Sequence, residues 1–317
     1  MVRAVISLTA SMPRRRFLAA TTLIATGSSV VGIARVRAAE RPTLSFGIVA
    51  DPQHADVDPA GTRFYRRSIS KLTEAVAHFN ESDLAFAVNL GDLIDRHWSS
   101  YDAILAPLAR SRHPFHHVLG NHDFDVADEY KVRVPERLAR TQRYGVIERG
   151  AWRFVLLDTN DLSLYAQPEN TAAYAEARAT YERFVATGAG NAQTWNGAVS
   201  DRQLRWFEAT CQAAAQAGQR VIVMAHHPVH PVDDHNAWNF PQILEVLSRN
   251  RNVVAWLNGH NHAGAFGVFE GVPCLTLRGM VETEQTNAYA VAHLHTDRVE
   301  LVGHGREPSR ELPLRGA

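Results

Sequence analysis

The chain has 317 residues, of which 45% are hydrophobic and 21% are charged, and its 33 basic side chains balance 33 acidic ones. This length allows one large domain or two ordinary ones with a sizeable buried core. Cys211 and Cys274 are the only cysteines, which excludes a disulfide scaffold and a cysteine zinc cluster; they either pair in an oxidising compartment or stay buried as free thiols.

Residues 1–38 have the features of an export signal. Three arginines at 14–16 precede an uncharged apolar stretch at 17–34, and residues 36–38 supply a small-residue cleavage pattern. Arginines followed by Phe and Leu resemble the twin-arginine signal, which is read by the machinery that exports folded proteins. An ordinary secretory signal is the alternative, and the stretch is long enough for an uncleaved anchor, although its Ala, Thr, Ser and Gly content favours a cleavable signal. We therefore expect a periplasmic or extracellular protein with residues 39–317 as its mature domain.

Removal of this signal changes the charge balance. The signal contains six arginines and no acidic residue, so 27 basic side chains remain against 33 acidic ones, a net charge of about −6. Nucleic-acid binding depends on phosphate neutralisation by Lys and Arg, so we expect no nucleic-acid partner. A small substrate held by metal cations is compatible with this charge, and we expect no stable membrane association after cleavage.

From residue 44 onward, buried strands alternate with helices. The predicted strands are 44–50, 84–90, 115–120, 153–158, 221–225 and 253–257, and the predicted helices are 62–80, 102–110, 172–186, 200–217 and 240–249. This alternation indicates a layered α/β fold. After residue 265, short alternating runs at 272–279, 288–295 and 298–304 predict a mostly antiparallel sheet. No repeat or low-complexity linker interrupts this part of the chain, so one domain is expected.

A polar cluster follows each of five predicted strands. The clusters are DPQH at 51–54, GDLID at 91–95, GNHD at 120–123, AHH at 225–227 and GHNH at 259–262. Loops at the carboxyl ends of strands converge in open α/β sheets, so five distant segments can share one site. A single cluster is compatible with turn chemistry or a structural histidine, but five in this order favour a common site.

The clusters combine carboxylates, amide oxygens and imidazoles, a set that suits divalent cations such as Mn²⁺, Zn²⁺ or iron. The predicted metal ligands are Asp51, Gln53, Asp92, Asn121, His226, His260 and His262. Two cations roughly 4 Å apart repel each other and need a bridging carboxylate, for which Asp92 is the candidate. With that bridge, Asp51, Gln53 and His262 would complete one cation site. The second site would then consist of Asn121, His226 and His260.

Two such cations would neutralise phosphate oxygens, lower the pKa of a bound water and align the resulting hydroxide for in-line attack on phosphorus. His122 is not required as a ligand, so it is the predicted catalytic residue that gives a proton to the leaving group or stabilises the transition state. Asp95 is predicted to orient this imidazole, with a helix cap or turn as its structural alternative.

These motifs resemble those of the calcineurin-like metallophosphoesterase superfamily, which read DxH, GDxxD, GNHD, a lone His after a strand, and GHxH. The resemblance covers most of residues 44–262 and implies a four-layer αββα sandwich, in which helices flank two mixed sheets. One position departs from the pattern, because Gln53 stands where the superfamily has histidine. His54 is an alternative ligand, but alternation along the chain points it elsewhere.

Gln53 and several other segments resemble the manganese-dependent ADP-ribose/CDP-alcohol diphosphatase family. These segments are GTRFYRRS, FVLLDTNDLS, NGAVSDRQLRWF, AHHPVHP, AWNF and VETEQTNAYA. The resemblance implies two divalent cations, with Mn²⁺ favoured, and a small nucleotide-type substrate cleaved at the pyrophosphate that links a nucleoside to a sugar or alcohol. A broader phosphodiesterase or phosphomonoesterase is the alternative, and a catalytically inactive scaffold of this fold is the second alternative.

Other residues near the motifs are candidates for substrate contact. They are Arg63, Tyr65, Arg66, Trp238, Asn239 and Glu282, with packing or solvation as the alternative for the arginines and aromatics. The outer histidines His227, His230 and His235 are expected to form hydrogen bonds around the site rather than bind metal. Asp158 and Asn160 are expected to shape a turn.

Overall fold

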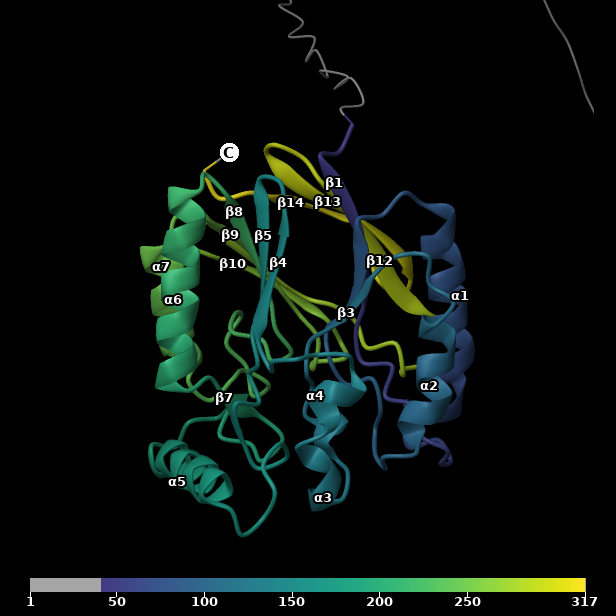
Figure 1. Ribbon diagram of the computed structural model, residues 1–317, viewed down its shortest axis with the longest axis vertical. Helices are drawn as coiled ribbons and strands as arrows, with labels where there is room; N and C mark the ends of the chain where they lie inside the picture. Colours follow the sequence, from purple (N-terminus) through teal and green to yellow (C-terminus); the bar gives the residue numbers. More distant parts are fainter. Residues whose placement is uncertain (1–40, 317) are drawn as a thin grey trace, which may run out of the picture. The chain divides into compact units, whose positions relative to one another are not determined.

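The computed structural model describes residues 41–316, and the export signal expected at 1–38 lies outside them. The described chain contains two six-stranded sheets (Figure 1). In spatial order the first sheet consists of β14 (Arg310–Pro313), β13 (Arg298–Gly305), β12 (Ala288–Leu294), β1 (Leu44–Val49), β2 (Phe86–Asn89) and β3 (Phe115–His117). The second consists of β10 (Ala265–Phe269), β11 (Val272–Thr276), β9 (Val253–Asn258), β8 (Arg220–Met224), β5 (Trp152–Leu156) and β4 (Gly145–Arg149). A short hairpin pairs β6 (Leu162–Ser163) with β7 (Gly197–Ala198).

Both sheets are mixed. In the first sheet β1, β2 and β3 are parallel, whereas β12 pairs antiparallel with β1, and β13 and β14 extend the sheet by further antiparallel pairings. In the second sheet β5, β8, β9 and β11 are parallel, and the edge strands β4 and β10 are antiparallel. The parallel strands of each sheet therefore deliver their carboxyl ends, and the loops that follow, to one end of that sheet.

Helices cover the outer face of each sheet (Figure 1). The helices α1 (Ser68–Glu81) and α2 (Ser100–Leu108) pack on the first sheet, and α6 (Asp201–Gln216) and α7 (Phe240–Arg249) pack on the second. The other helical segments are η1 (Tyr65–Arg67), η2 (His122–Phe124), α3 (Asp128–Lys131), α4 (Val134–Arg137) and α5 (Ala172–Ala186). This four-layer αββα arrangement of two mixed sheets confirms the fold class expected from the sequence. Within residues 41–316, no helix combines the length and apolar character needed to cross a membrane.

The central strands contribute side chains to two cores, one on each face. Between the sheets, the Phe46 ring stacks on Phe86 with centroids 5.1 Å apart and meets Phe154 edge-on at 5.4 Å. On the other face of β1, a Cβ at Gly47 would lie 2.9 Å from the Phe79 ring, so glycine lets α1 approach the sheet closely. Burial on both faces explains why β1 is apolar almost throughout.

The predicted helix and strand positions are largely confirmed, and the differences have local causes. The helix expected from residue 62 begins at Tyr65 because the chain before it pairs with other loops. Arg63 exchanges main-chain hydrogen bonds with Ala60 at 3.0 and 3.1 Å, and Phe64 N donates to Val281 O at 2.9 Å. The runs after residue 265 do not form a sheet of their own, because β11 pairs with β9 in one sheet and β12 pairs with β1 in the other.

The two thiols do not pair. Cys211 of α6 and Cys274 of β11 are both buried and free, and both lie in the core between the second sheet and its helices. Burial raises the pKa of each thiol to about 12, so both remain protonated and unreactive at neutral pH.

Candidate metal centre

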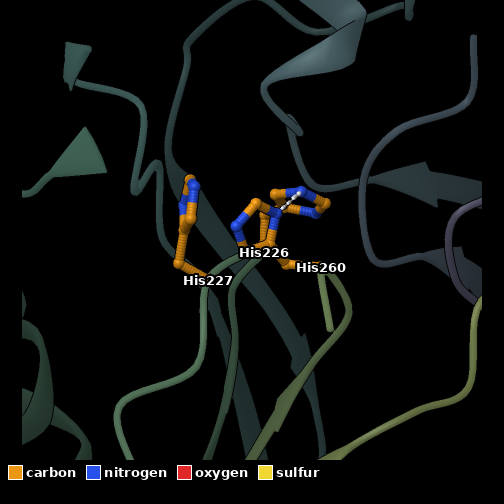
Figure 2. Close-up of side chains that lie close together, drawn as sticks. All are labelled: His226, His227 and His260. Atoms are coloured by element: carbon orange, nitrogen blue, oxygen red, sulfur yellow. Dashed lines mark hydrogen bonds between the residues drawn. The ribbon is translucent and has the colours of Figure 1, made fainter. Parts of the chain in front are cut away.

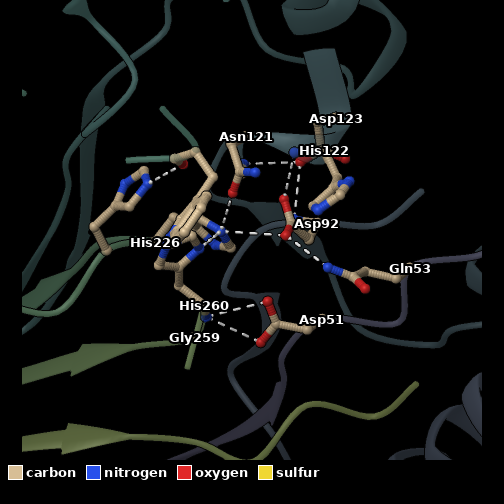
Figure 3. Close-up of polar contacts among 12 residues, drawn as sticks. Asp51, Gln53, Asp92, Asn121, His122, Asp123, His226, Gly259 and His260 are labelled. Carbon is tan, nitrogen blue, oxygen red and sulfur yellow. Dashed lines mark hydrogen bonds and ion pairs between the residues drawn. The ribbon is translucent and has the colours of Figure 1, made fainter. Parts of the chain in front are cut away.

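The five polar clusters meet at the carboxyl ends of parallel strands from both sheets (Figure 3). The structure brings together all seven predicted ligand residues: Asp51 and Gln53 after β1, Asp92 after β2, Asn121 after β3, His226 after β8, and His260 and His262 after β9. All seven side chains are largely buried. Four of these positions, Asp51, Gln53, Asp92 and His260, have φ between 44° and 73°, a left-handed conformation that is uncommon outside glycine. Such strain is concentrated at functional sites.

The Asp123 side chain joins, by hydrogen bonds, the loops that carry the predicted ligands Asp92 and Asn121. Its carboxylate accepts main-chain hydrogen bonds from Gly120 at 2.9 Å, Asp92 at 3.1 Å and Leu93 at 2.9 Å. Burial and the nearby Asp92 carboxylate raise the pKa of Asp123 to about 7. Asp123 is the last residue of the GNHD motif, and its role in joining these loops was not predicted from the sequence.

Each of the three predicted histidine ligands uses one ring nitrogen for a contact with a protein acceptor. These contacts are His226 Nδ1 to Leu90 O at 2.9 Å, His260 Nε2 to Asn196 Oδ1 at 2.8 Å, and His262 Nδ1 to Glu282 Oε1 at 2.8 Å. Because a carbonyl or carboxylate oxygen only accepts, the proton of each neutral imidazole belongs on that nitrogen. The other nitrogen of each ring therefore keeps its lone pair.

These lone pairs converge with other electron-pair donors. His226 Nε2 lies 3.1 Å from Asn121 Oδ1, 3.3 Å from Asp92 Oδ2 and 3.1 Å from His260 Nδ1. His262 Nε2 lies 3.7 Å from Asp51 Oδ1. Donors this close repel one another unless a positive charge lies among them. Without a metal, a proton on His226 can supply this positive charge. Burial opposes charge on His226, but the carboxylates of Asp92 and Asp51 raise its pKa to about 9.

The amide side chains also fit a cation. Gln53 Nε2 donates to Asp92 Oδ2 at 3.0 Å, whereas Gln53 Oε1 is buried without a hydrogen-bond partner among residues 41–316. Such an oxygen is available to a metal ion, which satisfies it as a hydrogen bond would. His54 points elsewhere, with Nδ1 3.2 Å from Tyr65 O. Carboxylate, amide and imidazole donors without a thiolate suit a divalent cation such as Mn²⁺.

His227 is close to this group but is differently bonded. Its ring centroid lies 5.1 Å from that of His226 and 4.3 Å from that of His260, but in Figure 2 a hydrogen bond joins only the other two rings. Nδ1 lies 2.7 Å from Thr159 Oγ1 and Nε2 lies 3.3 Å from Trp195 O, so both nitrogens have protein partners. Burial lowers the pKa of His227 to about 3. A hydrogen-bonding role matches what the sequence analysis expected.

A cavity of about 320 Å³ opens over the cluster. Besides predicted ligands, its lining includes Arg63, His122, Tyr165, Trp195 and His235. Two larger cavities, of about 510 and 760 Å³, lie around Trp152 and beneath α5, and neither is lined by any of the seven predicted ligands. The 320 Å³ cavity is therefore the one where chemistry at the metal centre has access to solvent.

His122 lies at the edge of this cavity, held by the chain around it. Its main-chain N–H donates to Asp92 Oδ1 at 2.8 Å, and its Nδ1 lies 2.9 Å from Asp95 O. Nε2 is thus the nitrogen left to exchange a proton. Asp95 orients the ring through its main-chain carbonyl, because its carboxylate lies 3.6 Å away and pairs with Arg96 at 2.5 Å.

Three of the six residues predicted to contact substrate, Arg66, Trp238 and Asn239, lie away from the cavity, which corrects the expectation. Arg66 is exposed and pairs with two aspartates of residues 56–58 at 2.5 and 2.8 Å. Trp238 is buried in the interior, where its ring N–H donates to a main-chain carbonyl at 2.9 Å. Asn239 exchanges hydrogen bonds of 2.7 and 3.1 Å with the main chain that follows β7. Arg63 alone of the six lines the cavity.

The remaining candidates occupy surrounding positions. Tyr65 is buried, whereas Glu282 contacts His262 from outside the cavity lining. His235 lines the cavity and pairs with a neighbouring aspartate at 2.7 Å, whereas the His230 ring packs near Phe269. Asp158 and Asn160 form the expected turn, with Asn160 N donating to Asp158 Oδ1 at 2.9 Å.

Three residues that complete the site were not predicted from the sequence. Tyr165 and Trp195 line the cavity, and Asn196 is the partner of His260. All three belong to the segment between β6 and β7, which contains α5 and lies away from the two large sheets (Figure 1). Asn196 could have been found from the sequence, because it begins the segment NGAVSDRQLRWF, one of those that carry the family resemblance. Nothing in the local sequence distinguishes Tyr165 and Trp195 from aromatic core residues.

Comparison with known proteins agrees with this geometry. The profile described as calcineurin-like phosphoesterase matches residues 44–264. A manganese-dependent ADP-ribose/CDP-alcohol diphosphatase from Danio rerio is 30% identical over 322 residues, covering 84% of this chain and 97% of that relative. The protein of the same name from Homo sapiens is 29% identical, covering 84% and 91%. The crystal structure of a dimetal phosphatase from Danio rerio superposes with a TM-score of 0.77 at 27% identity, covering 86% of this chain and 99% of that one.

Proposed function

Because the chain belongs to the calcineurin-like phosphoesterase family and is a metal-dependent phosphoester hydrolase, we propose that it cleaves the pyrophosphate bond of nucleoside diphosphates linked to a small sugar or alcohol, such as ADP-ribose and CDP-alcohols. The observation that carries the proposal is the composition of the 320 Å³ cavity, which combines the predicted metal ligands with Arg63, Tyr165 and Trp195. A cavity of this size suits a small molecule. The names of the relatives, which match over 84% of this chain or more, support this substrate class.

The proposed ligand sets divide the metal centre into two cation sites that share Asp92. Asp51, Gln53 and His262 would hold the first cation, and the three-residue set of Asn121, His226 and His260 would hold the second. The three contacts of His226 Nε2, at 3.1 to 3.3 Å, support the second set. The names of the relatives favour Mn²⁺ as the metal. When bound, two divalent cations neutralise phosphate oxygens and activate water for attack on phosphorus.

The chain's own residues supply the remaining chemistry. His122 is fixed through Nδ1, so Nε2 can give a proton to the departing phosphate oxygen. Arg63 is partly exposed in the lining and can pair with the second phosphate of a diphosphate. The ring faces of Tyr165 and Trp195 can pack against a nucleobase or sugar. Together these groups favour a diphosphate with an organic group on each side.

The products test this proposal. The purified chain with Mn²⁺ and ADP-ribose should release AMP and ribose 5-phosphate, and CDP-choline should release CMP. Hydrolysis of an aryl phosphate, with both nucleotide conjugates left intact, would instead support the broader phosphodiesterase or phosphomonoesterase. Absence of hydrolysis on every substrate, with metal bound, would support an inactive scaffold. The same reaction after chelation, with and without added Mn²⁺, separates this activity from a contaminant.

We also propose that the enzyme acts outside the cytoplasm, exported by the twin-arginine machinery. The proposal rests on the arginines at 14–16, the apolar stretch at 17–34 and the small-residue pattern at 36–38. Lysine in place of Arg15 and Arg16 should keep the protein in the cytoplasm of a host with this machinery. Continued export of that variant would point to an ordinary secretory signal.

A further inference from the structure

The turn at residues 279–283 links α1 to one of the two proposed cation sites, and the proposed reaction assigns it no role. It leads from β11 towards β12. Its main chain holds two predicted ligands, because Val281 N donates to Asp51 O at 3.0 Å and Gly279 N donates to His262 O at 3.2 Å. Asp51 and His262 belong to the same proposed cation site, so one short turn is tied to both.

Glu282 adds a side-chain contact to the same site. Its Oε1 lies 2.8 Å from His262 Nδ1 and fixes the proton on that nitrogen. Glu282 does not line the cavity, so it acts through His262 rather than on a substrate. The partners of the other two histidines are the neutral oxygens of Leu90 and Asn196. His262 therefore differs from both in having an anionic partner.

Lys71 of α1 holds this turn in place. It is 4% exposed, and its Nζ donates to three carbonyl oxygens, Met280 O at 2.9 Å, Glu282 O at 2.8 Å and Thr283 O at 2.6 Å. An ammonium group has three donors, and burial is costly unless they are satisfied. Here a single turn satisfies all three. Thr283, whose carbonyl is one of the three, has a left-handed conformation at φ 63°.

We propose that Lys71 and Glu282 are positioning residues that set the metal affinity of the site formed by Asp51, Gln53 and His262, without affecting the other site. The inference rests on the proposed ligand sets and deepens them. An anionic partner strengthens His262 as an electron-pair donor to a metal and prevents its ring from turning. Lys71 acts one step further away, because it fixes the main chain from which Glu282 reaches His262.

The test measures Mn²⁺ binding to Glu282→Gln and Lys71→Met in the full chain, by calorimetry and by metal analysis after dialysis. One of two bound Mn²⁺ ions should bind about 10–100-fold more weakly in each variant, and the other within about twofold of wild type. At saturating Mn²⁺, kcat and the KM for the nucleotide substrate should return to near wild-type values. Lys71→Arg should partly restore the lost affinity.

Arg67 and Glu284 provide a matched control. Their exposed ion pair, at 2.9 Å, joins the start of the same helix to the chain just after the turn, but neither residue contacts His262. Arg67→Met and Glu284→Gln should leave both affinities unchanged. A loss equal to that of Glu282→Gln would overturn the proposal, because any disturbance near the turn would then suffice.

Several results of these binding measurements would overturn the proposed role of Glu282 and Lys71. Unchanged affinities in Glu282→Gln overturn the proposal, and so does equal weakening of both ions. Glu282 Oε1 lies 3.7 Å from Arg63 Nε, so a raised KM with unchanged metal affinity would assign Glu282 to Arg63 instead. If Lys71→Met fails to fold, Glu282→Gln still decides. Fewer than two Mn²⁺ ions on the wild type would refute the proposed ligand sets and this inference with them, whereas two ions without hydrolysis of ADP-ribose would refute the proposed substrate alone.

Discussion

Alanine at Gly120 should disturb the metal centre without removing any ligand. An ideal Cβ at this position would lie 2.8 Å from Asp92 Cγ and would overlap both Oδ1 and the main-chain nitrogen of Asp92. Carbon atoms in contact need about 3.5 Å or more. Part of the overlap is with main chain, so a simple change of side-chain rotamer cannot relieve it. The carboxylate proposed to bridge the cations must therefore move.

The size of the effect follows from two losses at Asp92. Overpacking of this kind costs about 1–3 kcal/mol. Movement of Oδ1 also breaks the 2.8 Å hydrogen bond from His122 N, and such bonds to charged groups contribute about 1.5–3 kcal/mol. Because one displacement causes both, we expect the free energy of unfolding to fall by about 2–4 kcal/mol. For a chain of this size, Tm should fall by roughly 3–7 °C.

Three measurements on Gly120→Ala check this reasoning: Tm by calorimetry, bound Mn²⁺ by metal analysis, and kcat/KM with ADP-ribose. A bridge misplaced by about 1 Å should cost on the order of 100-fold in kcat/KM. Gly190→Ala is the control, because a Cβ there meets nothing within 4 Å. If Gly120→Ala kept the Tm, metal content and activity of the wild type, the close packing on Asp92 would be refuted.

The remaining predictions concern other groups. Asp92→Ala should lose both metal and activity, whereas His122→Ala should keep metal and lose kcat by about 100-fold or more; equal metal loss in the two would contradict the separate roles. Gln53→His should retain metal and shift the ratio of kcat/KM between ADP-ribose and CDP-choline, and complete loss of metal would show that Gln53 is wrongly placed in the ligand set. Burial lowers the pKa of His117 to about 3, from 6.5 in the unfolded chain. Between these pH values the unfolded state binds a proton at His117 that the folded state does not. The contribution of His117 to the free energy of unfolding is therefore fully present above pH 6.5 and falls by up to about 1.4 kcal/mol per pH unit as the pH drops. Denaturant titrations of His117→Leu should show a flatter pH dependence than wild type, and an identical slope would contradict this account.

The sequence was sufficient to predict that the seven proposed ligand side chains lie together, because the relevant pattern is local. Each predicted ligand follows a buried strand within a few residues, and strand ends are brought together by the sheet itself. Helix boundaries were also well predicted for α5 and α7, which begin and end at the expected residues. The resemblance of the motifs then supplied the arrangement of layers, which local periodicity alone leaves open.

The rest of the site depends on tertiary placement. Trp195 and Trp238 are both aromatic residues beside asparagine, yet the first lines the cavity and the second is 1% exposed. Nothing within a few residues of either distinguishes them, because burial depends on how α5 and its loops pack on the rest of the chain. The same holds for Glu282, which lies 20 residues from His262 and reaches it only because the turn doubles back beside β1.

The two proposed cations would also affect the mechanical integrity of the fold, besides their part in catalysis. Asp51 follows a strand of the first sheet and His262 a strand of the second, and Asn121 and His226 are divided in the same way. Each proposed cation is therefore a cross-link that resists shear between the sheets. Since a ligand that binds only the folded state stabilises it by about 1.4 kcal/mol for each tenfold excess over its Kd, the concentration of the divalent metal should affect the free energy of unfolding as well as the turnover.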